Sequence, residues 1–453
     1  MGGRCLPASM TELKTINDDI SMNKTNDYVN SLLEFLDNSP CNFLAVDTVK
    51  KILMANGFKE KKIDDKMSAK AGDKFFFTKN DSAIFAVTVG KKKPAETGFK
   101  IIAAHSDSPC FRIKPASEIK SEGGILRLNT EVYGGPILYT WFDRPLSLAG
   151  RVLLKGKDAL HPVTKLIKID RPLMCISHLA IHFNRAVNEG NHLSKQKDML
   201  PILSKVNSDF EWQNTLLNLV ADELQAEPSD IIDFDLMLYD VSKASLFGLN
   251  NEFISAGRLD DLSMVHAAIT AITEAEDKDA TLVAAIFDNE ETGSGTKQGA
   301  HSPVLGNMLL RLVMALGGDF EDFGRAIHRS FMVSADNAHS FHPNYPEKYD
   351  PTNHPSLGGG PCIKVNANCK YMSDAHSAAI FKSLCENAGA PFQYFVNHSD
   401  VAGGSTLGNI LTGQIDIEGV DVGNPVLAMH SVRETGSCDD HVNMIKVMKH
   451  FFS

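Results

Sequence analysis

The chain has 453 residues, of which 43% are hydrophobic and 22% charged, and it carries a formal net charge of −11. This length predicts two or three domains, and the apolar fraction excludes collagen-like, coiled-coil and wholly disordered classes. The acidic balance argues against a nucleic-acid partner, and no run reaches the roughly 20 apolar residues of a membrane helix. The eight cysteines are scattered without a C-x-x-C pair, and the start, MGGRCLPASM, lacks the apolar region of a secretion signal. We therefore expect reduced thiols, no membrane partner and a cytoplasmic location.

The N-terminal part predicts an extension, then helices, then strands. Residues 1–22 are polar and without pattern, and we expect a disordered extension there. Apolar residues recur with helical spacing from residue 27 to about 57. Residues 75–89 predict two strands joined by a turn at Asn80-Asp81, and residues 99–105 predict a further strand.

The rest of the chain contains two regions with different residue patterns. Residues 108–250 are rich in Gly and Pro and contain short β-like stretches, at 125–133, 146–154, 166–169 and 233–239, with a polar helical segment from about 178 to 222. After residue 255, helical patterns alternate with apolar runs, at 282–287, 331–333 and 426–429. Such alternation is typical of a parallel sheet covered by helices on both faces. We expect an α/β domain made from both chain ends, residues 23–107 plus 251–453, interrupted by a β-rich insertion at 108–250.

Imidazoles and carboxylates follow each apolar run of this α/β part. They come after four strand-like runs and comprise His105 and Asp107, then Asp288, Glu290 and Glu291, then Asp336 and His339, and finally His430. In an open α/β sheet, ligands bind beyond the carboxyl ends of the strands. We therefore expect four strands to deliver these side chains to one edge of one sheet.

These residue types are also those of a metal site. Two imidazoles and several carboxylates form a nitrogen and oxygen set suited to Zn²⁺, with Mn²⁺ or Co²⁺ as possible substitutes: His105, His430, Asp260, Glu291 and Asp336. Two metals that share a carboxylate lie about 3.5–4 Å apart and act together on a carbonyl or phosphoryl centre. Asp260 is the candidate bridge, and Glu290 can stay free as a general base beside its neighbour Glu291. The pattern predicts a dimetal hydrolase.

Simpler interpretations compete at single positions. An Asp or His after a strand often only caps the next helix, although five such positions together are hard to explain in that way. His178 and His182 lie four apart on a predicted helix, and as a lone pair they can equally be ordinary helix residues. A serine hydrolase is disfavoured because no G-x-S-x-G motif occurs.

Seven segments of the sequence resemble the aspartyl aminopeptidase family of co-catalytic zinc exopeptidases. They are Ala104–Cys110, Tyr139–Arg144, His178–His182, Arg258–Asp260, Asp288–Ser294, Ser334–His339 and Ala428–Glu434. The resemblance runs in order from about Asn23 to the C-terminus. It implies a mixed, mainly parallel sheet covered by helices and interrupted by a β-rich dimerisation domain.

The resemblance also implies how the site works. Two zinc ions per subunit would share Asp260, with His105 and Asp336 completing one ion and His430 and Glu291 the other. Glu290 would be the general base, and Asp107 would orient His105. His182 would reach into the active site of a neighbouring subunit.

The implied substrates are peptides with an acidic N-terminal residue, Asp or Glu, and the implied assembly is a homododecamer built from dimers. His339, Lys364 and Tyr371 match positions that line the substrate pocket. Two alternatives stay open: an aminopeptidase of the same fold that prefers neutral N-terminal residues, and a metal-loaded assembly or cargo protein with incidental activity. Two departures from the family pattern are Asp261, where Asn is common, and the bare stretch Gly358–Gly360.

Overall fold

The computed structural model describes residues 26–206, 213–276 and 279–453. The extension expected at residues 1–22 lies outside the described residues. Within the described part, no helix combines the length and apolar character needed to cross a membrane.

The two ends of the chain form a nine-stranded sheet. Its order is β1 (Lys59–Glu60), β2 (Lys74–Lys79), β3 (Ala83–Thr88), β13 (Thr281–Phe287), β4 (Phe99–His105), β14 (Phe331–Ala335), β18 (Glu418–Gly423), β16 (Cys362–Lys364) and β17 (Gln393–Phe395). The four central strands, β13, β4, β14 and β18, are mutually parallel, whereas β3 and β16 run antiparallel to their central neighbours. The mixed, mainly parallel sheet is confirmed.

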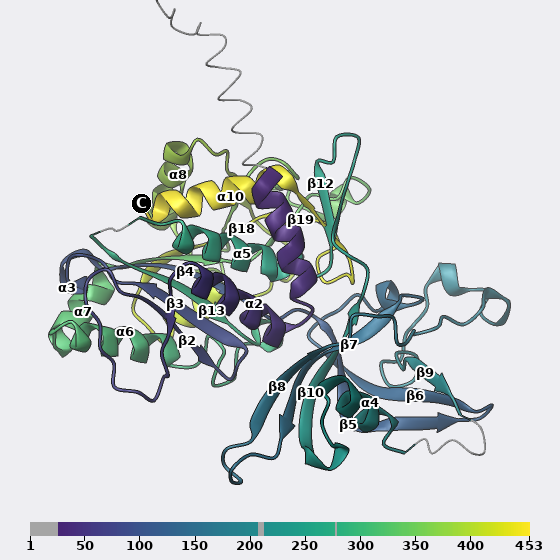
Figure 1. Cartoon of the computed structure of the whole chain (residues 1–453). Coiled ribbons are helices and arrows are strands. Elements are labelled where there is room, and N and C mark those ends of the chain that lie inside the picture. The colour runs from purple at the N-terminus through teal and green to yellow at the C-terminus, as the bar shows by residue number, and fades with distance from the viewer. Residues whose placement is uncertain (1–25, 207–212, 277–278) are drawn as a thin grey trace, which may run out of the picture.

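Helices cover both faces of this sheet because apolar side chains fill both faces of its central strands. One core cluster unites the sheet with the helix at 26–38, α2 (Asn42–Ala55), α5 (Leu259–Thr273), α8 (Ala375–Ala388) and α10 (Cys438–Phe451). The opposite cluster includes α6 (Val304–Ala315), α7 (Phe320–His328) and α9 (Leu407–Thr412). In Figure 1, α6 and α7 lie on the side of the sheet away from α5 and α10. A short helix, α3 (Pro94–Thr97), precedes β4.

The middle of the chain forms a six-stranded antiparallel sheet with a core of its own. Its order is β8 (Val163–Lys168), β7 (Leu146–Leu154), β10 (Ile231–Asp240), β5 (Cys110–Ser121), β6 (Ile125–Tyr133) and β9 (Ile202–Lys205), with α4 (Thr215–Leu224) packed against it. Figure 1 shows it as a second lobe below and to the right of the first. The strands expected between residues 125 and 239 are all present, and a dimerisation role for this lobe stays a prediction.

Two expectations about local structure are wrong. Between residues 178 and 222 the only α-helix of the described residues begins at Thr215, and His182 lies in a 3-10 turn, Ile181–Phe183. Leu179, Ile181 and Phe183 are exposed, so no buried apolar face stabilises a helix there. His178 and His182 therefore do not share a helix face.

The second error concerns the run 426–429, expected as a strand of the main sheet. Only Pro425–Val426 (β19) is extended, and it pairs with β15 (Ala338–His339) in a separate two-stranded sheet. The strand cannot continue because Ala428 and His430 have φ of 54° and 68°, in the left-handed region. A three-stranded sheet, β11 (Ser245–Phe247), β12 (Phe253–Ala256) and β20 (Glu434–Ser437), lies next to it, because Leu427 forms an antiparallel bridge with Thr435 of β20.

Arg151 of the inserted sheet ties the two lobes together. Its guanidinium bonds to the Asp235 carboxylate at 2.8 Å and donates to the Asn80 carbonyl at 3.0 Å. The same guanidinium lies 4.5 Å from the ring centre of Phe43 on α2. Asn80 and Asp81 form the expected turn, with φ of 58° and 56°. The inserted lobe is thereby held against the end of the main sheet where β2 meets β3.

A buried pair of histidines lies between three helices. The ring nitrogen Nδ1 of His266 on α5 is 2.9 Å from Nε2 of His441 on α10, and Ser31 Oγ is 3.0 Å from Nε2 of His266. His441 Nδ1 is buried and has no hydrogen-bond partner among the described residues. Burial lowers the pKa of His266 to about 4, with Glu274 opposing the shift, and burial beside His266 lowers the pKa of His441 well below its usual value.

Both histidines should make the fold sensitive to acid. The unfolded chain binds their protons below about pH 6.5 while the folded protein does not, so stability is lost as the pH falls below that value. Between about pH 7 and pH 5, His266 alone accounts for about 2 kcal/mol of the unfolding free energy. His441→Leu should shrink the loss measured by urea unfolding at the two pH values, whereas exposed His328→Leu should not. An unchanged loss in His441→Leu would rule this origin out.

Candidate metal centre

Three of the four expected strands end at one edge of the main sheet. β4 ends at His105, β13 ends at Phe287 just before Asp288, and β14 ends just before Asp336. The register pairs Phe287 with His105, so these chain segments leave the sheet at the same level. The fourth group, His430, arrives from the loop after β19 instead, as the left-handed φ at that residue requires.

All five predicted ligands lie at this edge, in three adjoining clusters. Within each cluster, one donor atom from every residue lies within 4.8 Å of the others. One cluster contains His105, Asp260, Asp261 and Asp336, another contains Asp260, Glu291 and His430, and the third contains His105, Glu290 and Glu291. Asp260 belongs to both of the first two. Its Oδ1 lies 3.7 Å from His105 Nε2, and its Oδ2 lies 3.4 Å from His430 Nε2. The two carboxylate oxygens of Asp260 therefore face the two imidazoles.

The imidazoles are oriented as metal ligands. Nδ1 of His105 lies 3.1 Å from the Asp107 carbonyl, and Nδ1 of His430 lies 3.1 Å from the Gly135 carbonyl. A carbonyl can only accept, so each Nδ1 carries a hydrogen, and in the neutral imidazole each Nε2 then has a lone pair that faces the carboxylates. This arrangement is the usual one for histidine that binds a metal.

Several donor atoms of the cluster have no partner within the described part of the chain. His105 Nε2, Asp260 Oδ1 and Glu291 Oε1 are buried and make no hydrogen bond there. Buried polar atoms are nearly always paired, because an unpaired one costs free energy. A cation between these lone pairs satisfies all of them, so the donor set fits a metal centre with nitrogen and oxygen ligands.

The site concentrates negative charge. Burial and the neighbouring acids raise the pKa of Glu290 to about 9, and burial raises the pKa of Glu291 to about 7. Burial disfavours the charged form of His430, but the negative charges of the Asp260 and Glu291 carboxylates, 3.4 and 3.2 Å from its Nε2, outweigh this effect and raise its pKa to about 11. A cluster that holds protons this firmly is one that a divalent cation would stabilise by displacing them.

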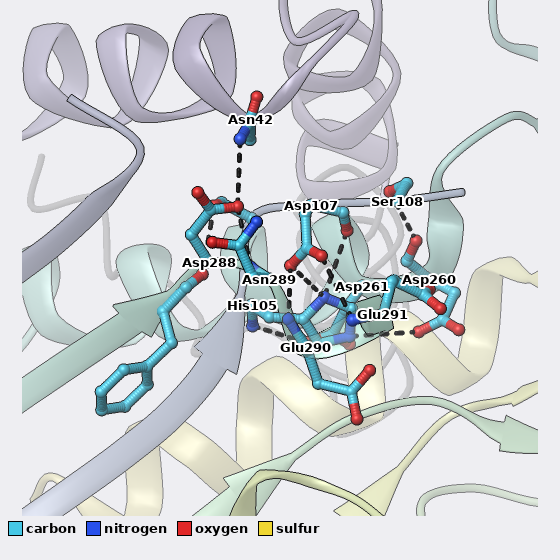
Figure 2. A network of polar contacts seen from close by, with 12 residues as sticks. Asn42, His105, Asp107, Ser108, Asp260, Asp261, Asp288, Asn289, Glu290 and Glu291 are labelled. Atoms are coloured by element: carbon cyan, nitrogen blue, oxygen red, sulfur yellow. Dashed lines mark hydrogen bonds and ion pairs between the residues drawn. The ribbon is translucent and has the colours of Figure 1, made fainter. Parts of the chain in front are cut away.

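Asp107 supports the cluster from behind, and Figure 2 shows it above His105. Its buried carboxylate accepts the backbone N–H groups of Glu290 at 3.1 Å and Glu291 at 3.2 Å, and Tyr133 donates its hydroxyl at 2.7 Å. Oδ1 of Asp107 also lies 3.3 Å from His105 Nδ1. Glu290 itself points its carboxylate away from this network, without a bond to the other residues drawn (Figure 2).

Glu434 is a supporting residue that sequence reasoning did not assign. Its buried carboxylate accepts the backbone N–H of Asp260 at 3.1 Å and that of His430 at 2.8 Å. One acid thus fixes the backbone of two predicted ligands that lie far apart in the chain. The segment Ala428–Glu434 is one of those that resemble the aminopeptidases, which was the available signal.

The two departures from the family pattern also lie near this edge. Asp261 belongs to the first cluster and accepts the backbone N–H of His105 at 3.0 Å through Oδ2. The Asp440 carboxylate at the start of α10 accepts the N–H groups of Gly358 and Gly360 at 2.8 and 2.7 Å. Both glycines have positive φ, 82° and 93°, which explains why this stretch lacks side chains.

The predicted substrate-binding residues, and His182, differ in how far they lie buried near the clusters. Lys364 is buried with its Nζ 3.3 Å from Asp336 Oδ2 and 5.7 Å from the ring centre of Tyr371. His339 is exposed on β15, with its ring 5.8 Å from that of Phe395. His182 lies exposed on the inserted lobe and belongs to none of the three clusters.

A family model described as aminopeptidase I zinc metalloprotease (M18) matches residues 35–452. The chain belongs to the M18 family. It is 53% identical, over 94% of its length and 98% of the relative's, to the Clostridium novyi protein named "Probable M18 family aminopeptidase 2". A Pseudomonas aeruginosa protein of the same name is 39% identical, over 93% of this chain and 97% of the relative.

Solved M18 structures have the same fold. A chain of the solved Ape4 and Nbr1 complex superposes with a TM-score of 0.91 at 36% identity, and the match covers 95% of this chain and 86% of that one. The structure of the S. cerevisiae mApe1 dodecamer superposes with a TM-score of 0.83 at 26% identity, and the match covers 95% of this chain and 97% of that one. The protein is thus an M18 zinc metallo-aminopeptidase, a hydrolase, and the expected family and enzyme class are confirmed.

Proposed function

We propose that this M18 aminopeptidase releases N-terminal Asp and Glu from peptides, with two zinc ions per subunit. The proposal rests on one observation above all: two adjoining ligand clusters share Asp260, and each supplies one imidazole whose Nε2 faces the shared carboxylate. His105 and Asp336 would complete one zinc site, and His430 and Glu291 the other. When bound, such a pair of ions polarises the scissile carbonyl and lowers the pKa of water toward neutrality.

The remaining steps belong to the protein's own residues. Glu290 takes a proton from the attacking water while the new carbon–oxygen bond forms, and returns it to the leaving amine as the carbon–nitrogen bond breaks. Asp107 keeps the His105 imidazole in the tautomer that leaves Nε2 free. His182 of a neighbouring subunit would donate to the carbonyl oxygen as negative charge develops there.

The buried charge of Lys364 supports the acidic preference. A buried ammonium can recognise the carboxylate of an Asp or Glu side chain, which a neutral side chain cannot offer. His339 and Tyr371 would complete the wall of this pocket.

An assembly is part of the proposal, and we place the protein in the cytoplasm as a homododecamer built from dimers. The dodecamer of the mApe1 relative supports the assembly. So do the exposed apolar side chains of Leu179, Ile181 and Phe183, which flank His182 and would be covered by a second copy. The seven cysteines of the described residues are free thiols, which suits a reducing compartment.

Cleavage of Asp-, Glu- and Leu-anilides by the zinc-loaded protein tests the specificity. We expect kcat/KM for the acidic substrates to exceed that for Leu by at least about tenfold, because a Leu side chain offers the Lys364 ammonium no carboxylate to pair with. Lys364→Met should lower the two acidic values more than the Leu value, so that the ratio falls. Faster release of Leu would instead favour the aminopeptidase that prefers neutral residues, and background turnover at full zinc content would favour an assembly or cargo protein.

A further inference from the structure

Tyr133, the last residue of β6, brings the inserted sheet into the metal centre. Its hydroxyl donates to Asp107 Oδ2 at 2.7 Å and accepts from Asn289 Nδ2 at 2.8 Å. Asn289 directly precedes Glu290, the proposed base, and Glu291, a proposed ligand. Tyr133 of the inserted lobe therefore contacts two residues of the main lobe. One is Asp107, which supports the cluster, and the other is Asn289, which begins the turn that carries Glu290 and Glu291.

The donors and acceptors around the Tyr133 hydroxyl are ordered from Asn289 to Asp107. The side-chain oxygen Oδ1 of Asn289 accepts from Thr296 Oγ1 at 2.9 Å and from Gln298 Nε2 at 2.8 Å, so the side-chain NH₂ group faces Tyr133. Because that NH₂ group donates to the phenol oxygen, the single hydroxyl hydrogen points to Asp107. The chain of bonds from Asn289 through Tyr133 ends on the carboxylate that holds His105 and the backbone of Glu290 and Glu291.

The turn that carries Glu290 depends on the same residues. Asn289 has a φ of 62°, a left-handed conformation that Asn tolerates better than most residues, and it begins the 3-10 turn Glu290–Thr292. The Asp107 carboxylate holds this turn through two backbone N–H groups, and Asn289 holds it through its side chain. In Figure 2, Asn289 and Asp107 flank the backbone from which Glu290 and Glu291 project.

We propose that Tyr133 and Asn289 are positioning residues that set the zinc affinity of the site and the alignment of Glu290. This rests on the proposed function of Glu290 and the ligands. Without the hydroxyl, Asp107 loses one of its donors, the Asn289 NH₂ group loses its acceptor, and the turn is no longer held against the inserted sheet. Supporting residues of this kind typically change metal affinity or activity by about 10–100-fold.

Tyr133→Phe, compared with Tyr239→Phe, tests the proposal. Tyr239 is a matched control, because it lies buried in β10 of the same sheet and donates its hydroxyl to the Ile169 carbonyl at 2.8 Å, apart from the clusters. Zinc affinity is measured by competition with a chelator in the absence of substrate, and kcat and KM are measured separately. We expect Tyr133→Phe to weaken zinc binding and lower kcat, each by about tenfold, with KM unchanged, and Tyr239→Phe to leave all three near wild type.

Asn289→Gly provides a second variant that keeps the left-handed backbone but removes the amide. It should reproduce the losses of Tyr133→Phe, and the double variant should lose little more than either alone, because the two residues act through one chain of bonds. If Tyr133→Phe does not fold, Asn289→Gly decides by the same measurements. Zinc affinity and kcat equal to those of Tyr239→Phe would overturn the proposal. A wild-type protein that binds no zinc or releases no residue would instead overturn the proposed function.

Discussion

Glu290→Gln is expected to lower kcat by about a thousandfold, because general bases contribute about 10²–10⁴-fold and an amide cannot take a proton from water. The side chain keeps its shape and lies beside the cluster with its carboxylate outside the hydrogen-bond network (Figure 2). The zinc content should therefore stay near that of the wild type. The measurement is kcat on an Asp-anilide together with zinc per subunit by atomic emission.

Glu347→Gln is the matched control. Glu347 is exposed on another 3-10 turn, Pro346–Lys348, so the same loss of a carboxylate should change neither quantity. If Glu290→Gln retains substantial turnover at full zinc content, another group takes the proton and the assignment of the base is wrong.

Asp260→Asn is expected to have the largest effect on metal binding. Asp260 is the residue whose two oxygens face both imidazoles, at 3.7 and 3.4 Å, so its loss affects both zinc sites. Asn offers one oxygen and an NH₂ group that a cation repels. Zinc should fall below one ion per subunit, and turnover should fall by about a thousandfold or more, consistent with the several kcal/mol that metal ions supply to such reactions.

His105→Ala and His430→Ala place this result in context. Each removes an imidazole from a different zinc site, so each should lower both zinc content and activity. The loss of zinc should be smaller than in Asp260→Asn, because only one of the two sites loses a ligand. Circular dichroism of each variant shows whether the fold is intact. Full occupancy by two zinc ions in Asp260→Asn would contradict the shared carboxylate.

Much of this site could be predicted from the order of residues because the chemistry follows strand ends. His105 and Asp336 come directly from β4 and β14, whose buried apolar runs are easy to recognise and whose parallel pairing brings their ends together. Asp260 does not follow a strand of the main sheet. It lies at the start of α5, and it is the candidate bridge because of its place in the segment Gly257–Asp261, a role that the resemblance to the aminopeptidases also implies.

Two supporting residues, Glu434 and Tyr133, could not be found in this way. Glu434 is 174 residues from Asp260, and Tyr133 is 156 residues from Asn289, so no local spacing links them. The helix expected near His182 failed for a different reason. Its polar and apolar residues have a helical spacing, but the apolar ones stay exposed in one subunit, so nothing holds a helix together there.

Anomalous diffraction at the zinc edge, from crystals of the zinc-loaded protein, tests the central claim most directly. We expect two peaks of similar height about 3.5–4 Å apart, as in other two-metal sites, with Asp260 between them, His105 beside one and His430 beside the other. A single peak, or peaks bound to other residues, would contradict it.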